Sequence, residues 1–124
     1  MNSQMITTET IKECRRRLQM QKAEIMNRFR TAHQNFRQTE HRGDEIDQTV
    51  AQQEEHSFLV NQDRLRNQLL EIEMALGRME QGTFGVCEET DEMIETERLL
   101  AIPWTRLSIE GAELREATNR KFAR

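Results

Sequence analysis

The spacing of apolar residues predicts a long helix over residues 7–38. Apolar or small side chains recur there every three or four residues, with one longer step that Gln21 or Lys22 fills. Such a seam on an otherwise polar helix is typical of a coiled coil, in which one face packs against a second helix. Thr7 and the hydroxyl residues that follow it are candidates for capping the first turn. The positions of this seam are Ile11, Cys14, Leu18, Ile25, Phe29, Ala32 and Phe36.

A second seam predicts a helix from about residue 47 to residue 81. Its steps alternate between four and three residues, and the apolar spacing weakens toward Ile46, Val50 and Ala51. Gly82 follows the last apolar position and is a typical stop signal for a helix. The positions of this seam are Phe58, Gln62, Leu65, Leu69, Ile72, Leu76 and Met79.

The segment between the two helices predicts a turn. Residues 38–45 lose the apolar spacing and contain Gly43, the only glycine before residue 77. Glycine and short polar residues favour a change of chain direction. We therefore expect an antiparallel hairpin over residues 1–82 with its tip at about 39–47. Because the apolar contacts weaken toward that tip, we expect it to be the most exposed and least stable part.

The last third of the chain has a different pattern. Apolar residues crowd into positions 84–107, where Gly85 and Pro103 are turn residues, so we expect a small irregular globular end. Residues 109–122 predict a C-terminal helix with Ser108 as its N-cap. The expected fold class is therefore mainly all-α, with a coiled-coil hairpin over 1–82 and the globular end with its helix over 83–124. The candidates for the small core of that end are Phe84, Val86, Trp104 and Leu107.

The composition agrees with a helical chain that buries little surface. Of the 124 residues, 32% are charged and 35% are apolar, with one proline and five glycines. A net charge of −4 argues against a protein that coats nucleic acid. The chain shows neither a long apolar run nor an export signal, so we expect a cytoplasmic protein that does not engage membranes. In that compartment Cys14 and Cys87 are expected to stay reduced.

The globular end carries a specific motif. Its residues are Phe84, Gly85, Cys87, Ile94, Arg98, Leu99, Ala101, Pro103 and Leu107. With them, residues 82–111 resemble the C-terminal zinc finger of the DksA/TraR family of bacterial transcription regulators. That family carries two C-x2-C pairs separated by 17 residues, and the positions at that spacing here are Cys87, Thr90, Ser108 and Gly111. Since structural zinc prefers four thiolate or imidazole ligands, we expect a degenerate finger without metal or other cofactor.

Cys87 has two interpretations. It is either a small buried residue of the finger or a reactive redox thiol. If metal is absent, another source of stability must replace it, and the small apolar core is the candidate.

The resemblance extends back to the tip. The family carries an acidic motif there, and this chain has Asp44, Asp47 and Thr49 at the matching positions, where Thr49 replaces an alanine. The match covers residues 40–111 well and residues 7–38 only in architecture. The second helix is also similar to that of the family at Glu54, Glu55, Ser57, Asn61, Asp63 and Arg64.

The resemblance implies that the chain binds RNA polymerase and not specific DNA sequences. The tip carboxylates Asp44 and Asp47 would enter the secondary channel toward the active site, where basic groups attract them. Asn61 and Arg64 would face the polymerase. Asp44 and Asp47 also have a purely structural interpretation, because aspartate is common at a turn that precedes a helix. The bulkier, hydroxylated Thr49 is expected to weaken or redirect the action.

The resemblance also bears on ligands and on alternatives. The family binds guanosine tetraphosphate through basic residues, but the matching positions here are Glu71, Ile102 and Ala112, so we expect no strong response to that alarmone. No catalytic motif is present, and enzyme activity is not expected. Two alternatives stay open. One is a scaffold or adaptor of the family's shape, and the other is an antagonist that occupies the channel without regulating initiation.

Overall fold

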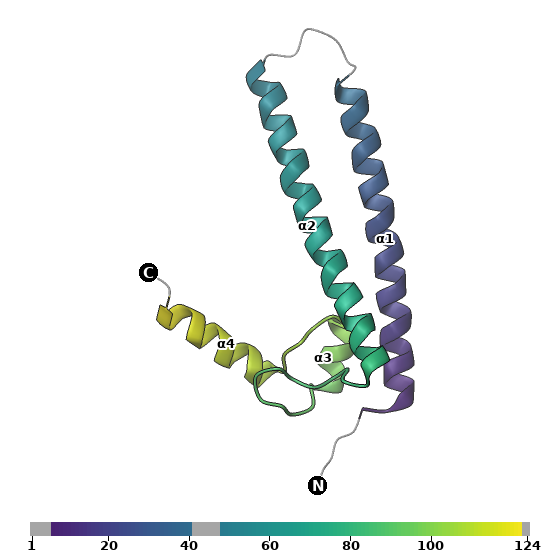
Figure 1. The fold of residues 1–124 in the computed structure, drawn as a ribbon, viewed down its shortest axis with the longest axis vertical. Coiled ribbons are helices and arrows are strands. Elements are labelled where there is room, and N and C mark those ends of the chain that lie inside the picture. Colours follow the sequence, from purple (N-terminus) through teal and green to yellow (C-terminus); the bar gives the residue numbers. More distant parts are fainter. Residues whose placement is uncertain (1–5, 41–47, 123–124) are drawn as a thin grey trace. The chain divides into compact units, whose positions relative to one another are not determined.

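A computed structural model describes residues 6–40 and 48–122 of the chain. The described residues form α1 (Thr8–Glu40), α2 (Gln48–Gln81), α3 (Thr96–Ala101) and α4 (Ile109–Phe122). The two long helices are antiparallel, and α3 and α4 follow them (Figure 1). The expected fold class is confirmed. No helix among the described residues has the combination of length and apolar content that crossing a bilayer needs.

The ends of the long helices follow the local signals in the sequence. The Thr10 backbone N–H donates to Thr7 Oγ1 at 3.1 Å, so Thr7 caps α1. Gly82 has a left-handed φ of 79° and ends α2, and the Thr83 backbone N–H donates to the Arg78 carbonyl at 2.9 Å. This arrangement satisfies the last carbonyls of the helix, and glycine adopts it without a steric penalty.

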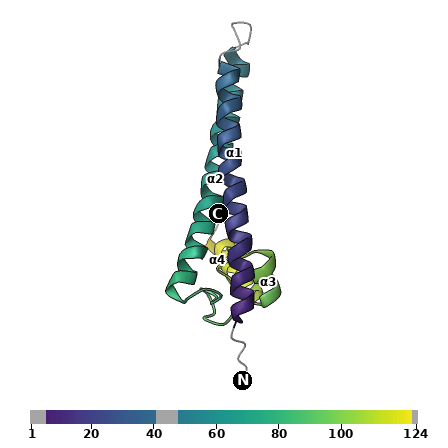
Figure 2. The ribbon, with the colours of Figure 1, turned by 90° about the vertical axis from the view of Figure 1, so that its right-hand side faces the viewer.

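The chain divides into two compact units. The first contains the described parts of residues 1–19 and 71–124. Here the N-terminal turns of α1 pack against α3 (Figure 2), and the Cys14 thiol donates to the Leu99 carbonyl at 3.5 Å. The Arg17 guanidinium donates to the Leu100 carbonyl. Buried apolar residues of this unit are Cys14, Leu18, Ile72, Ala75, Phe84, Cys87, Ile94 and Leu99.

Two details of this unit differ from the expectations. Val86 is 39% exposed and not part of the core. It pairs with Met93 in an isolated antiparallel bridge, and because neighbours in extended chain face opposite sides, the burial of Gly85 and Cys87 leaves Val86 outside. Trp104 and Leu107 are only half-buried. The globular end also contains the short helix α3, where we expected irregular chain. Buried Leu99 of α3 takes the central place that Val86 was expected to share.

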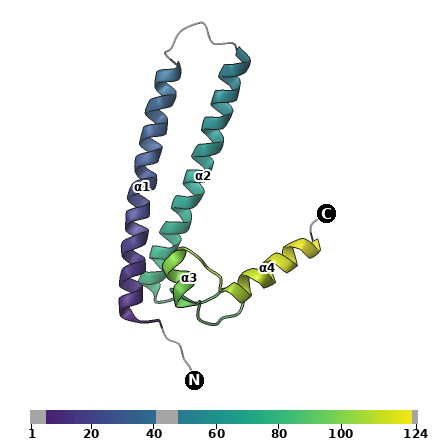
Figure 3. The same ribbon diagram turned by 180° about the vertical axis from the view of Figure 1, so that it is seen from behind.

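The second unit contains the described parts of residues 20–70, in which the remaining turns of α1 and α2 run side by side (Figure 3). Ile25 and Leu65 are buried in their seam. The rings of Phe36 and Phe58 are stacked, with centroids 4.3 Å apart and an interplanar angle of 11°. Gln62 is only 2% exposed, and neither polar atom of its amide has a hydrogen-bond partner among the described residues.

Candidate functional site

Cys87 lies at the centre of a tight loop in the first unit. Its backbone N–H donates to the Glu92 carbonyl at 2.8 Å, and its carbonyl accepts from the Asp91 N–H at 2.9 Å. Asp91 closes the loop with a φ of 60°, in the left-handed region that aspartate tolerates better than most residues. The loop therefore wraps around Cys87 and holds Thr90 close to it. This is the turn that a C-x2-C pair needs in order to point two side chains at one centre.

The start of α4 meets this loop. The Ser108 hydroxyl lies 3.4 Å from Cys87 Sγ and donates to it, and the Gly111 N–H donates to Ser108 Oγ at 3.0 Å. Ser108 is thus the N-cap of α4, as predicted. Gly111 is buried, and a Cβ placed on it would overlap Cys87 Sγ. The structure therefore brings together all four finger positions, Cys87, Thr90, Ser108 and Gly111.

These four residues do not fit a zinc ion. Cys87 is the one thiol among them, the hydroxyls of Thr90 and Ser108 are poor neutral ligands, and Gly111 has no side chain. Among the described residues, no group of three or more histidine, cysteine, aspartate or glutamate side chains could hold a metal. The centre of the finger is occupied by Cys87 Sγ and its hydrogen bonds.

The hydrogen bonds change the acidity of this thiol. Burial raises the pKa of Cys87, but hydrogen bonds from the side chains and backbone of Ser108 and Thr90 outweigh it and lower the pKa to about 7. Burial raises the pKa of the other thiol, Cys14. Of the two cysteines, Cys87 is therefore the one whose thiolate the fold stabilises.

An ion-pair cluster surrounds the finger and was not predicted from the sequence. The Arg115 guanidinium lies 2.8 Å from a carboxylate oxygen of Glu89 and 3.6 Å from one of Glu88. The Arg106 guanidinium lies 3.8 Å from a carboxylate oxygen of Glu88 and 3.7 Å from one of Glu71. The cluster joins α2, the Cys87 loop and α4. Its members are far apart in sequence, so no local spacing could have revealed their partners.

Two arginines of the same unit bind backbone carbonyls. Arg98 Nε donates to the Leu107 carbonyl at 2.8 Å, and Arg78 donates to the Trp104 carbonyl at 3.2 Å. Arg98 of α3 therefore fixes the position of the irregular segment that precedes α4. These contacts tie irregular backbone to the helices α2 and α3.

The remaining candidate residues belong to the hairpin. Asp44 and Asp47 lie outside the described residues. Thr49 is exposed in the first turn of α2. Arg64 donates to Asn61 Oδ1 at 3.0 Å, so the two proposed polymerase-facing residues are adjacent and oriented by each other.

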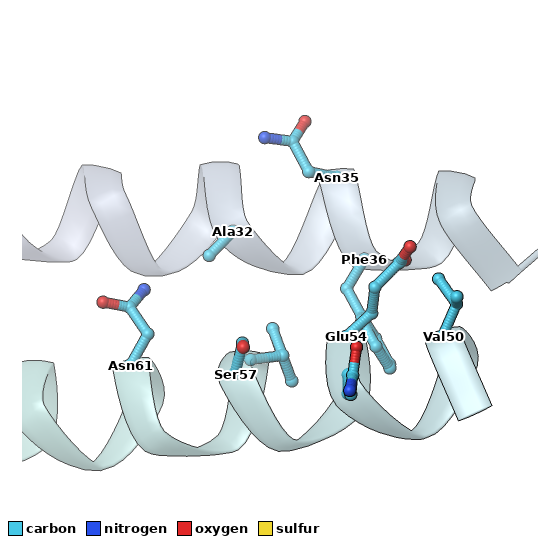
Figure 4. Close-up of a pocket in the computed structure, with 9 residues that line it drawn as sticks. Ala32, Asn35, Phe36, Val50, Glu54, Ser57 and Asn61 are labelled. Atoms are coloured by element: carbon cyan, nitrogen blue, oxygen red, sulfur yellow. The ribbon is translucent and has the colours of Figure 1, made fainter.

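A groove runs between α1 and α2 in the second unit (Figure 4). Its volume is about 550 Å³, and both helices contribute side chains to it. Sequence reasoning missed it, because the seam residues on either side are ordinary coiled-coil positions. The residues that line it include Ala32, Phe36, Val50, Glu54, Ser57 and Asn61.

Comparisons with known proteins agree on one family. A family profile described as "Prokaryotic dksA/traR C4-type zinc finger" matches residues 82–117. The chain is 35% identical over 100 residues to the "RNA polymerase-binding transcription factor DksA" of Caulobacter vibrioides, covering 80% of this chain and 70% of that protein. It is 46% identical over 46 residues to "General stress protein 16O" of Bacillus subtilis, covering 37% of this chain and 28% of that protein. The solved structure of transcription factor DksA2 from Pseudomonas aeruginosa superposes with a TM-score of 0.84 at 30% identity, covering 91% of this chain and 88% of that one.

Proposed function

The chain belongs to the DksA/TraR family of transcription factors, and we propose that it binds bacterial RNA polymerase in the secondary channel and regulates transcription from there. The family consists of transcription factors and not of enzymes. The observation that carries the proposal is the likeness to DksA2, which extends over 91% of the chain and so includes hairpin and finger together. A partner of bacterial RNA polymerase acts in the cytoplasm, as expected from the sequence.

In this proposal the hairpin tip acts by its charge. Asp44 and Asp47 approach the active site, where basic groups and bound magnesium attract carboxylates. Thr49, exposed in the first turn of α2, follows them and sets how closely the tip approaches. Asn61 and Arg64 contact the polymerase further along α2. Their hydrogen bond of 3.0 Å supports a shared role, because it fixes both side chains before binding.

We propose that the finger performs its structural task without zinc. The support is the donor set, one thiol and two hydroxyls, and the overlap of Cys87 Sγ with any side chain at position 111. The hydrogen bonds among Cys87, Ser108 and Gly111 take the place of metal–ligand bonds in linking the loop to α4. Elemental analysis of protein purified without chelators is expected to find no stoichiometric zinc. A zinc signal that persists in a Cys87→Ala variant would indicate a different site.

We also propose that guanosine tetraphosphate has little effect on the chain. Glu71 stands where the family has a basic residue, and Arg106 lies 3.7 Å from its carboxylate. A polyphosphate would meet the negative charge of Glu71 and would compete with it for Arg106. In vitro transcription with and without the alarmone tests this point.

The central experiment measures binding of fluorescently labelled protein to RNA polymerase core, with competition by an established secondary-channel factor. Saturable binding that the competitor displaces is the expected result. A variant with Asp44→Asn and Asp47→Asn is expected to lose its effect on transcription while binding is partly retained. The matched control is Asp63→Asn, which removes an exposed carboxylate that pairs with Arg66 at 3.2 Å.

The outcomes separate the candidate functions. Absence of binding at micromolar polymerase contradicts the proposal and favours the scaffold. Binding and competition without any effect of the wild-type protein on initiation favours the channel-occupying antagonist. Silent tip substitutions on an active protein would remove the assigned role of Asp44 and Asp47 but not the polymerase as the partner.

A further inference from the structure

The groove between α1 and α2 has an aromatic wall. Phe36 and Phe58 stack within it, and the ring of His33 meets Phe58 edge-on at 5.2 Å. Both phenylalanines are half-buried, so part of their ring surface stays accessible. A flat, partly exposed aromatic surface of this kind binds an aliphatic stem or a guanidinium plane.

The rim of the groove is polar, with one negative charge. Glu54 extends from α2 toward α1 beside Phe36, whereas Asn35 points away from α2 (Figure 4). Ser57 and Asn61 continue the rim along α2. Among the described residues, none that lines the groove is basic.

Glu54 is the unusual member of this rim. Its side chain is half-buried, and no ion pair involves it within residues 6–40 and 48–122. The other two partly buried carboxylates in the described part of the chain, Glu13 and Glu71, each have an arginine close by. Covering Glu54 with an apolar partner would leave an unpaired charge out of water, which is unfavourable. The groove is therefore complementary to an occupant that combines an apolar stem with a positive head.

We propose that this groove receives a basic side chain of RNA polymerase, with the stem against Phe36 and Phe58 and the charged head on Glu54. This inference rests on the proposed function and adds a specific contact to it. The polymerase is the partner because Asn61, one of the residues proposed to face it, also lines the groove. Contact through the groove adds a second anchor to the one at the hairpin tip.

The test is the affinity of the full-length protein for RNA polymerase core. Glu54→Gln keeps the size of the side chain and removes its charge, and it is expected to weaken binding about fivefold to thirtyfold, the loss of one charge-assisted contact. The loss should shrink as ionic strength is raised, because salt screens the contact. Glu55→Gln is the matched control, since Glu55 is exposed and does not line the groove, and it is expected to change the affinity less than twofold.

A second pair of variants tests whether binding to RNA polymerase needs the open space of the groove. Ser57→Trp fills the groove, and Gln52→Trp places the same ring on an exposed position of α2 outside it. Only the first is expected to weaken binding, while circular dichroism shows equal helix content for both.

Each result decides the proposal. Equal affinity of Glu54→Gln and wild type at low salt overturns it and leaves the proposed function intact. Loss of binding by Ser57→Trp without loss by Glu54→Gln also overturns it, because the occupant would then be apolar. Failure of the wild type to bind polymerase overturns both proposals together, which distinguishes this case from the other two.

Discussion

The sulfur of Cys87 occupies the space in which a side chain at Gly111 would begin. A Cβ on Gly111 would overlap Sγ, and it would also lie 3.3 Å from Ser108 Oγ. The two residues are the first and last of the four finger positions. In this chain, the absence of a side chain at one of them is what allows the thiol of the other to lie at the centre of the finger.

This relationship predicts a size coupling between positions 87 and 111. Gly111→Ala is expected to lower the free energy of unfolding by about 1 to 3 kcal/mol, because overpacking a buried site outweighs the better helix propensity of alanine. In a Cys87→Ala background the same change should cost less than about 1 kcal/mol. Urea denaturation of the four proteins measures the coupling. Additive effects would show that the two residues do not compete for the same space.

The thiolate of Cys87 predicts a rise of stability with pH. The pKa of Cys87 is about 7 in the folded chain, below its ordinary value of 9.0. The stabilisation of the fold by the thiolate is therefore complete above pH 9 and is lost as the pH falls through 7. The free energy of unfolding is expected to increase by about 1 to 3 kcal/mol from pH 6 to pH 9, relative to Cys87→Ser. Ser108→Ala should raise the pKa of Cys87 and reduce this increase.

Absorbance of the thiolate at 240 nm follows the same titration directly. Cys87→Ser serves as the control, because its remaining signal comes from Cys14, whose pKa is raised by burial. A titration near pH 9 in both the wild type and Ser108→Ala would contradict the role of the hydroxyl.

The ion-pair cluster predicts a salt-dependent contribution to the stability of the finger. Arg106→Gln removes the contacts with Glu71 and Glu88 and is expected to lower the free energy of unfolding by about 0.5 to 1 kcal/mol at low salt. The difference should shrink in about 0.5 M salt, where charges are screened. Arg66→Gln is the control, because it breaks a single exposed pair with Asp63 on one helix.

The buried amide of Gln62 predicts a stabilising substitution. Neither its oxygen nor its nitrogen has a hydrogen-bond partner among the described residues, so Gln62→Leu is expected to raise the free energy of unfolding by about 1 to 2 kcal/mol. Gln68→Leu, at an exposed position of α2, should change it little. Light scattering after size-exclusion chromatography shows whether the added apolar residue also promotes self-association. A destabilised Gln62→Leu hairpin would indicate that the amide is satisfied by water.

The two long helices could be predicted because their signal is local and repeated. The seams define which face of each helix is buried, and Gly82 and Thr7 mark ends through backbone rules that need no partner. The seam was less accurate near the C-terminal end of α2, where Ala75 is fully buried and Leu76 only half-buried. That end of α2 belongs to the first unit, together with the start of α1, α3 and the Cys87 loop, so its buried face is no longer set by one partner helix.

The globular end shows why the rest of the fold could not be predicted from the sequence. The six residues of α3 are too few to display a helical period, and the helix depends on Leu99 packing near Cys14. Val86 was expected inside because it is apolar, but its neighbour Cys87 takes the buried side of this extended segment and Val86 is exposed. Burial in such short segments is decided by contacts with distant residues.

The sequence by itself determined the helical hairpin, because periodicity is a property of the linear chain. Its resemblance to a known family determined that family and the positions of the four degenerate finger residues. Only the tertiary structure decided what those positions do. The Ser108 hydroxyl donates a hydrogen bond to the Cys87 sulfur, and that sulfur leaves no room for a side chain at Gly111. Arg106 pairs with the carboxylates of Glu71 and Glu88. Among the described residues, the tertiary structure also left Glu54 without an ionic partner, beside two aromatic rings. Each of these depends on groups that lie close in space and far apart in sequence, or on the facing of two helices, and no local pattern records them.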